Sequence, residues 1–163
     1  MIAFVWAESK NGTIGNHGGL PWKMPADMHH FKETTINHRI LAGRSTYNSF
    51  GRPLPKRINM VLTNHDQSEF DDQVVVFNSL DQFLADYREN GDDVYVVGGA
   101  QVFKALLPYV DVLYRTVIDA AIDGDTKMPP IDYHKFKLVS QTHYAPDAKN
   151  QYPYTFETYQ KQS

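Results

Sequence analysis

The sequence predicts an α/β protein in which a mostly parallel mixed β-sheet is flanked by helices and ends in an antiparallel hairpin. Apolar runs of strand length alternate with helical patterns over most of the chain. Two later strand-like runs, at 136–140 and 154–159, follow each other with no helical pattern between them, which is typical of a hairpin. We therefore expect one sheet with a parallel body and an antiparallel end.

The chain opens with a continuous apolar run over residues 1–7, which indicates a strand buried on both faces of the sheet. Further strands are expected at 39–43, 58–63, 73–77, 94–98 and 110–118, and helices near 25–35, 44–50, 79–88 and 99–107. No repeat, low-complexity block or Pro/Ser-rich linker interrupts this order. A single domain over residues 1–163 is the simplest division.

Composition narrows the class of function. The 163 residues are 42% hydrophobic and 21% charged, which is ordinary for a globular protein, and the net charge of -3 argues against nucleic-acid binding. With no cysteine and no HExxH spacing among the histidines, no disulfide or metal site is expected. The apolar start is too short and lacks the basic flank of a signal peptide, so we expect a cytoplasmic protein without membrane association.

Residues 11–19 contain four glycines and little that could pack, so they indicate a mobile loop. The loop leads directly into the helix expected at 25–35. Pro25 suits the first position of that helix, which places Asp27 in the first turn, at the start of an otherwise apolar face. A glycine loop next to an acid suggests a lid over a site.

Two interpretations of Asp27 are open from the helix alone. The carboxylate could interact with the free N–H groups and the dipole of the first helical turn. Alternatively, it could handle protons in a dry site, because neighbours such as Met28 and Phe31 would desolvate it and raise its pKa.

Two junctions between a strand and a helix offer backbone N–H groups to a phosphate. One is 94–103, where a buried strand runs into Gly98 and Gly99; alone, such a glycine pair is more often a tight turn. The other is 41–47, where Arg44 and two hydroxyls follow Gly43, although a Ser or Thr helix cap with a surface arginine explains this pattern equally well.

The chain resembles the dihydrofolate reductases of bacteria over nearly its whole length. The matching blocks are Ala7, Ile14-Gly15, Leu20-Pro21-Trp22, Pro25-Ala26-Asp27, residues 43–47, Arg52-Pro53-Leu54-Pro55, Arg57, residues 97–100 and Gly124-Asp125-Thr126. Their order and separations are together highly specific. The resemblance implies reduction of dihydrofolate to tetrahydrofolate with NADPH, by hydride transfer to C6 and protonation at N5. It further implies a role in one-carbon metabolism, binding of antifolates and a monomer.

The resemblance assigns the substrate contacts. The Asp27 carboxylate would pair with the 2-amino group and N3 of the pterin and supply acidity directly or through a water, with Thr116 in support. Leu20 and Trp22 would complete the catalytic region, and Arg57 would hold the glutamate α-carboxylate, although taken alone it is an ordinary surface charge. The apolar walls would be Val5, Ala7, Met28, Phe31, Phe50 and Leu54, with Val97 and Phe103 toward the nicotinamide.

The resemblance also assigns the cofactor site and implies a cis Gly98–Gly99 peptide bond. Its members would be Ala7, Ile14, Gly15, Gly43, Arg44, Ser45, Thr46, Leu62, Thr63, Asn64, Val97, Gly98, Gly99, Ala100, Gln101, Val102 and Phe103. Arg44, Ser45, Thr63 and Asn64 would receive the 2′-phosphate that distinguishes NADPH from NADH. Asp125 would hold the lid closed by accepting backbone N–H bonds from near Gly15.

Two other functions stay open. A reductase of the same fold that acts on another pyrimidine or pterin, such as one from riboflavin synthesis, would share the glycine and phosphate features. That function would not explain why Trp22, Asp27, Phe31 and Arg57 occur together in this chain. A non-catalytic nucleotide-binding module would bind NADPH without turnover.

Overall fold

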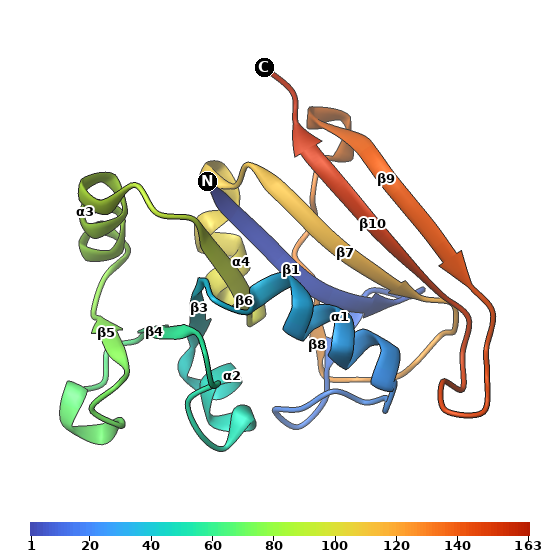
Figure 1. Cartoon of the computed structure of the whole chain (residues 1–163), viewed down its shortest axis with the longest axis horizontal. Helices are drawn as coiled ribbons and strands as arrows, with labels where there is room; N and C mark the ends of the chain where they lie inside the picture. Colours follow the sequence, from blue (N-terminus) through green and yellow to red (C-terminus); the bar gives the residue numbers. More distant parts are fainter.

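The computed structural model describes residues 1–163. Ten strands form two sheets (Figure 1): β1 Ile2–Ser9, β2 Thr13–Gly15, β3 Arg39–Gly43, β4 Ile58–Leu62, β5 Val75–Phe77, β6 Val94–Gly98, β7 Val112–Ile118, β8 Thr126–Lys127, β9 Phe136–Tyr144 and β10 Tyr154–Lys161. The helices are α1 Pro25–Thr35, α2 Arg44–Phe50, α3 Leu80–Asn90 and α4 Ala100–Leu106. Three short 3-10 helices lie at Gln67–Glu69, Leu107–Tyr109 and Tyr133–Lys135.

The main sheet has eight strands in the order β5-β4-β3-β6-β1-β7-β10-β9. All pairs from β5 to β7 are parallel, whereas β7–β10 and β10–β9 are antiparallel. The predicted fold class and C-terminal hairpin are therefore confirmed. The opening strand β1 lies in the middle, between β6 and β7, and all eight of its residues are buried.

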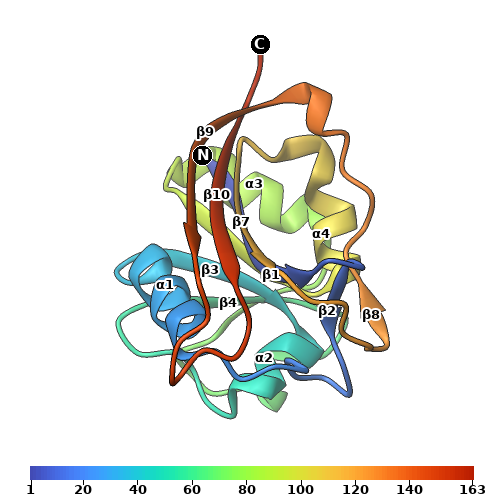
Figure 2. The ribbon, with the colours of Figure 1, turned by 90° about the vertical axis from the view of Figure 1, so that its right-hand side faces the viewer.

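Helices cover both faces of the sheet, and Figure 2 shows α1 on the side opposite α3 and α4. The larger core cluster lies under α3 and α4 and includes Phe4, Phe83 and Phe103, all buried. On the other face, Phe31 of α1 packs against a cluster that contains Val5 and Ile40. Side chains on the two faces of β1 therefore pack into two different core clusters.

Local sequence explains where α3 begins and ends. The Ser79 side chain accepts a hydrogen bond of 3.1 Å from the Gln82 N–H, which caps the first turn. Gly91 ends the helix with a φ of 69°, a left-handed conformation that favours glycine. Several predicted bounds differ by one or two residues: β5 begins at Val75 and β7 at Val112, where the sequence indicated 73 and 110.

The sequence did not predict β2 and β8, which pair antiparallel as a separate two-stranded sheet. The glycine loop was expected to have little to pack, and this was wrong: Thr13 is fully buried and Ile14 packs against the larger core cluster. None of the helices is long and apolar enough to cross a membrane.

Candidate active site

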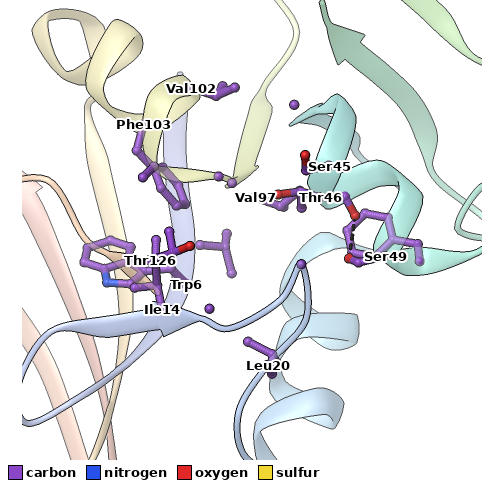
Figure 3. A pocket seen from close by; sticks show the side chains of 18 of the residues that line it. Trp6, Ile14, Leu20, Ser45, Thr46, Ser49, Val97, Val102, Phe103 and Thr126 are labelled. Atoms are coloured by element: carbon purple, nitrogen blue, oxygen red, sulfur yellow. Dashed lines mark hydrogen bonds between the residues drawn. The ribbon is translucent and has the colours of Figure 1, made fainter. Parts of the chain in front are cut away.

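A cleft of about 1600 Å³ opens at the carboxyl ends of β1, β3 and β6, next to α1, α2 and α4. Figure 3 shows part of it, with the glycine loop at Ile14 and Leu20 on one side and the start of α2 at Ser45 and Thr46 on another. Every residue that the sequence nominated for substrate or cofactor lines this cleft. Asp125, nominated as the contact that holds the lid, does not line the cleft and contacts the glycine loop at His17.

Asp27 is buried in the cleft at the start of α1, with only 7% of its surface exposed. Met24 is the N-cap of this helix and its own side chain forms no cap, but the Ala26 N–H donates to Asn150 Oδ1 at 3.0 Å. No N–H group of the first turn donates to the Asp27 carboxylate, so the interpretation of Asp27 as a helix cap is wrong. It is also the only acidic side chain that lines the cleft, among several cationic and histidine side chains.

Burial raises the pKa of Asp27 to about 6, because a low-dielectric environment disfavours the charged form. Thr116 of β7 and Trp22 face the carboxylate and lower its pKa, but burial has the larger effect. The expected source of that burial was partly wrong. Met28 is 60% exposed, because it lies on the outer side of α1 at the rim of the cleft. The buried residues of α1 are Asp27 and Thr35, so the inward face of this helix is less apolar than expected.

Trp22 is buried beside this carboxylate. Its indole Nε1–H has no hydrogen-bond partner within 3.5 Å in the protein, although it lies close enough to the Asp27 carboxylate to lower the pKa of that group. Because a buried donor without a partner costs free energy, it is available to a ligand or a bound water in the cleft. Leu20, which precedes it on the loop, is 52% exposed at the cleft rim.

Arg57 is not an ordinary surface charge. Its Nε donates to the Pro55 carbonyl at 3.0 Å and its Nη1 to the Thr35 hydroxyl at 3.2 Å. Partial burial lowers its pKa, and no carboxylate pairs with it, so its remaining N–H groups are free toward the cleft. Such a fixed guanidinium is suited to bind a carboxylate in a bidentate pair.

Buried Asn59 holds the loop that carries Arg57, and the sequence gave no reason to single it out. Its side chain accepts from the Leu54 N–H at 2.9 Å and donates to the carbonyls of Leu54 and Arg57 at 3.0 and 3.2 Å. A polar residue inside a predicted strand is the signal that could have found it.

The two junctions between strand and helix lie against each other. Ala42 of β3 is in register with Gly98 of β6, and the peptide bond between Gly98 and Gly99 is cis, as expected. A Cβ atom at Gly43 would lie 3.1 Å from Val102, and one at Gly98 or Gly99 would lie 3.3 Å from the hydroxyl oxygen of Thr46. A larger residue at any of the three positions would have to displace a neighbouring side chain, and the φ of 126° at Gly98 also favours glycine.

The first N–H groups of α2 and α4 have no side-chain cap, because their N-caps are Gly43 and Gly99. The alternative of a Ser or Thr cap is therefore wrong for α2. Arg44 and Ser45 are exposed at its start, and Arg44 forms no ion pair. Two free helix starts and an unpaired guanidinium together suit the phosphate groups of a dinucleotide.

The glycine loop is fixed at its base to the segment 122–128. Asn11 exchanges two hydrogen bonds of 3.1 Å with the backbone of Ile122, and the Thr13 hydroxyl donates to the same carbonyl at 2.7 Å. Asp125 accepts the N–H of His17 at 3.0 Å, two residues beyond the expected Gly15. This bond lowers the pKa of Asp125.

Further residues line the cleft that the sequence did not nominate: Trp6, Gly18, Gly19, Lys23, His29, His30, Lys32, Ser49, His65, Asn78, Ser79, Leu80 and Thr126. Asn78 directly follows β5 and donates to the Thr63 carbonyl at 2.9 Å. Because parallel strands end at one edge of a sheet, its position after a predicted strand could have indicated it.

Comparisons with known proteins agree with this site. The family model described as dihydrofolate reductase matches residues 1–161. The dihydrofolate reductases of Enterococcus faecium and Bacillus subtilis strain 168 are each 40% identical to the chain over its full length, covering 98% and 96% of those proteins. A solved structure, dihydrofolate reductase from Enterococcus faecalis complexed with NADP(H) and RAB-propyl, is 38% identical with a TM-score of 0.93, covering all of this chain and 97% of that one.

Proposed function

The chain belongs to the dihydrofolate reductase family, and we propose that it reduces 7,8-dihydrofolate to 5,6,7,8-tetrahydrofolate, with hydride transfer to C6 and protonation at N5. As a member of this family it is an oxidoreductase that uses NADPH. The observation that carries the proposal is Asp27, the single buried acid of a cleft otherwise lined by cationic, polar and apolar groups.

The residues present fit NADPH. The glycines at 43, 98 and 99 leave space that a Cβ atom would fill, and the uncapped starts of α2 and α4 face the same cleft. Arg44, Ser45, Thr63 and Asn64 would hold the 2′-phosphate, and residues 98–103 the diphosphate. When bound, NADPH supplies the hydride.

Asp27 would bind the 2-amino group and N3 of the pterin and raise the protonated population of the substrate. With a pKa of about 6, it exchanges protons near neutral pH, which an ordinary aspartate does not. Trp22 would place its free N–H toward the substrate or a water next to it. Val5, Phe31, Phe50 and Leu54 would enclose the rings, with Ala7 beneath and Met28 at the rim.

Arg57 would bind the α-carboxylate of the glutamate at the far end of α1. This requirement separates the proposal from a same-fold reductase of riboflavin synthesis, whose pyrimidine substrate carries no glutamate. The fixed and unpaired Arg57 therefore favours a folate. We further propose that residues 1–163 act as one domain, because β1 at the centre of one continuous sheet joins both halves of the cleft, and as a monomer, because one chain supplies all the residues that line the cleft.

Absorbance of NADPH followed with and without dihydrofolate tests this function. We expect consumption that requires dihydrofolate, is inhibited by an antifolate and is not supported by the pyrimidine substrate of riboflavin synthesis. Consumption with the pyrimidine alone would favour the second reductase. NADPH binding without turnover on either compound would favour a non-catalytic module.

A further inference from the structure

A row of polar side chains crosses four strands on the sheet face opposite Thr116. The register places Trp6 of β1 beside Arg115 of β7, Arg115 beside Glu157 of β10, and Glu157 beside Gln141 of β9. Successive residues of a strand point to opposite faces, so this row lies on the reverse side of the strand that presents Thr116 to Asp27.

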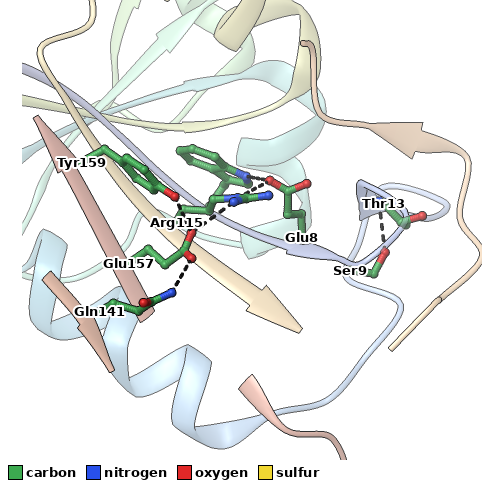
Figure 4. A network of polar contacts seen from close by, with 8 residues as sticks. Glu8, Ser9, Thr13, Arg115, Gln141, Glu157 and Tyr159 are labelled. Carbon is green, nitrogen blue, oxygen red and sulfur yellow. Dashed lines mark hydrogen bonds and ion pairs between the residues drawn. The ribbon is translucent and has the colours of Figure 1, made fainter. Parts of the chain in front are cut away.

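Arg115 is the centre of this row, as Figure 4 shows. Its Nε donates to Glu8 Oε1 at 2.8 Å and its Nη1 to Glu157 Oε1 at 3.1 Å. Glu157 also accepts from Gln141 at 3.1 Å and from the Tyr159 hydroxyl at 3.2 Å. We refer to Glu8, Arg115, Glu157 and Gln141 as the ladder.

The ladder is costly to bury. Glu8 and Glu157 are 7% and 9% exposed, and charges leave water at a free-energy cost that good geometry must offset. Burial opposes the charge of Arg115, but the hydrogen bond and the charge of Glu8 hold its pKa above the ordinary value. Apolar side chains of similar volume could pack between these strands without this cost.

At its β1 end, the ladder contacts Trp6, a residue that lines the cleft. Glu8 Oε1, which binds Arg115, also accepts the indole Nε1–H of Trp6 at 3.1 Å. The Trp6 ring lines the cleft and lies 6.0 Å from the ring of Phe103. Figure 3 shows Trp6 together with Ile14 and Thr126, on the side of the cleft that includes Phe103.

We propose that Glu8 and Arg115 are positioning residues: the ladder fixes the orientation of the Trp6 indole and thereby shapes the cofactor half of the cleft. The inference rests on the proposed binding of NADPH. None of the ladder residues lines the cleft, so they act through Trp6 alone.

The test begins with protein labelled with ¹⁵N. The chain has two tryptophans, so its spectrum contains two indole N–H signals, which Trp6→Phe assigns. Glu8→Met removes the acceptor and should shift the Trp6 signal while that of Trp22 stays in place. Glu8→Gln keeps a carbonyl acceptor and should restore most of the original position.

NADPH affinity then tests the consequence. Glu8→Met should raise the Kd for NADPH about three-fold or more, within the range of couplings between residues in contact, and leave the Kd for dihydrofolate unchanged. In the Trp6→Phe background, Glu8→Met should not raise the Kd for NADPH any further. Glu89→Gln, a change at an exposed glutamate of α3, is the control and should alter neither signal nor affinity.

An equal rise of the Kd in the Trp6→Phe background, or an unmoved Trp6 signal, would overturn the inference. If Glu8→Met does not fold, Glu157→Gln, farther along the ladder, is compared in the same two backgrounds and should raise the Kd only where Trp6 is present. A parent protein that binds no NADPH would overturn the proposed function as well. NADPH binding that both ladder variants leave unchanged would overturn only the positioning role.

Discussion

The hydroxyl of Thr35, at the last position of α1, accepts a hydrogen bond of 3.2 Å from Nη1 of Arg57. Asp27 lies eight residues earlier, at the start of the same helix, so about 12 Å of helix axis separates the two positions. One rigid element thus sets both the acid and the guanidinium. We propose that α1 fixes the distance between the groups that bind the two ends of the substrate.

Thr35→Val should weaken dihydrofolate binding through Arg57. The valine keeps the shape but removes the hydroxyl that orients the guanidinium, so we expect the Kd for dihydrofolate to rise about five-fold, with the Kd for NADPH unchanged. Thr34→Val is a matched control, because Thr34 makes the same helical bond to the carbonyl four residues earlier without contacting Arg57. An equal effect of both substitutions on dihydrofolate would show that only helix stability matters.

Asp27→Asn should stabilise the fold at neutral pH. Burial raises the pKa of Asp27 from about 3.8 to about 6, so the folded protein binds a proton that the unfolded chain releases between these values. The contribution of this proton to the free energy of unfolding of the parent is fully present below pH 4. It is lost as the pH rises through 6. Asparagine carries no such proton and avoids the loss.

The difference in free energy of unfolding between Asp27→Asn and the parent should therefore grow from pH 4 to pH 6 and stay level above it, reaching on the order of 2–3 kcal/mol. Urea denaturation at several pH values measures it. A difference that does not change with pH would mean that Asp27 titrates normally and is not desolvated.

Arg44→Ala should remove most of the preference for NADPH over NADH. Arg44 is exposed and unpaired at the start of α2, where a charge-assisted hydrogen bond to the 2′-phosphate is possible. We expect the ratio of kcat/KM for the two cofactors to fall about ten-fold, with NADH use little changed. An equal loss with both cofactors would mean that Arg44 does not contact the 2′-phosphate.

Asp125→Ala should release the glycine loop. The carboxylate of Asp125 accepts the His17 N–H at 3.0 Å and is exposed, so its loss leaves the core intact. Single-turnover hydride transfer should slow about ten-fold, NADPH should bind more weakly and thermal stability should stay close to that of the parent. Asp123→Ala removes an exposed carboxylate two residues away that contacts no other residue by hydrogen bond or ion pair, and it should leave the rate unchanged. Equal rates in the parent and in Asp125→Ala would reject the lid contact.

The central strand and its neighbours could be predicted because their signals are local. Residues 1–7 are apolar without alternation, which is typical of a strand buried on both faces, and β1 is buried along its whole length. The three-residue β2 and two-residue β8 are too short to show any period, and their pairing joins segments more than 100 residues apart. Nothing in the residues 11–19 indicates that partner.

Side-chain environments were harder to predict than their location. The sequence placed Asp27 and Met28 in one site, but a shift of one residue turns a helical side chain by about 100°, so Asp27 is buried and Met28 is exposed. The contact of Arg57 with Thr35 and the ladder around Arg115 depend on tertiary packing. No spacing in the sequence indicates either of them.

The pH dependence of single-turnover hydride transfer in the parent and in Asp27→Asn tests the central claim most directly, namely that the buried Asp27 supplies the acidity for reduction of dihydrofolate. We expect the parent rate to exceed the Asp27→Asn rate by several orders of magnitude at neutral pH, and the difference to shrink as pH falls, because substrate protonated in solution bypasses the missing acid. NADPH affinity should be nearly equal in the two proteins. Equal rates at neutral pH, or a deficit in Asp27→Asn that low pH does not reduce, would contradict the account.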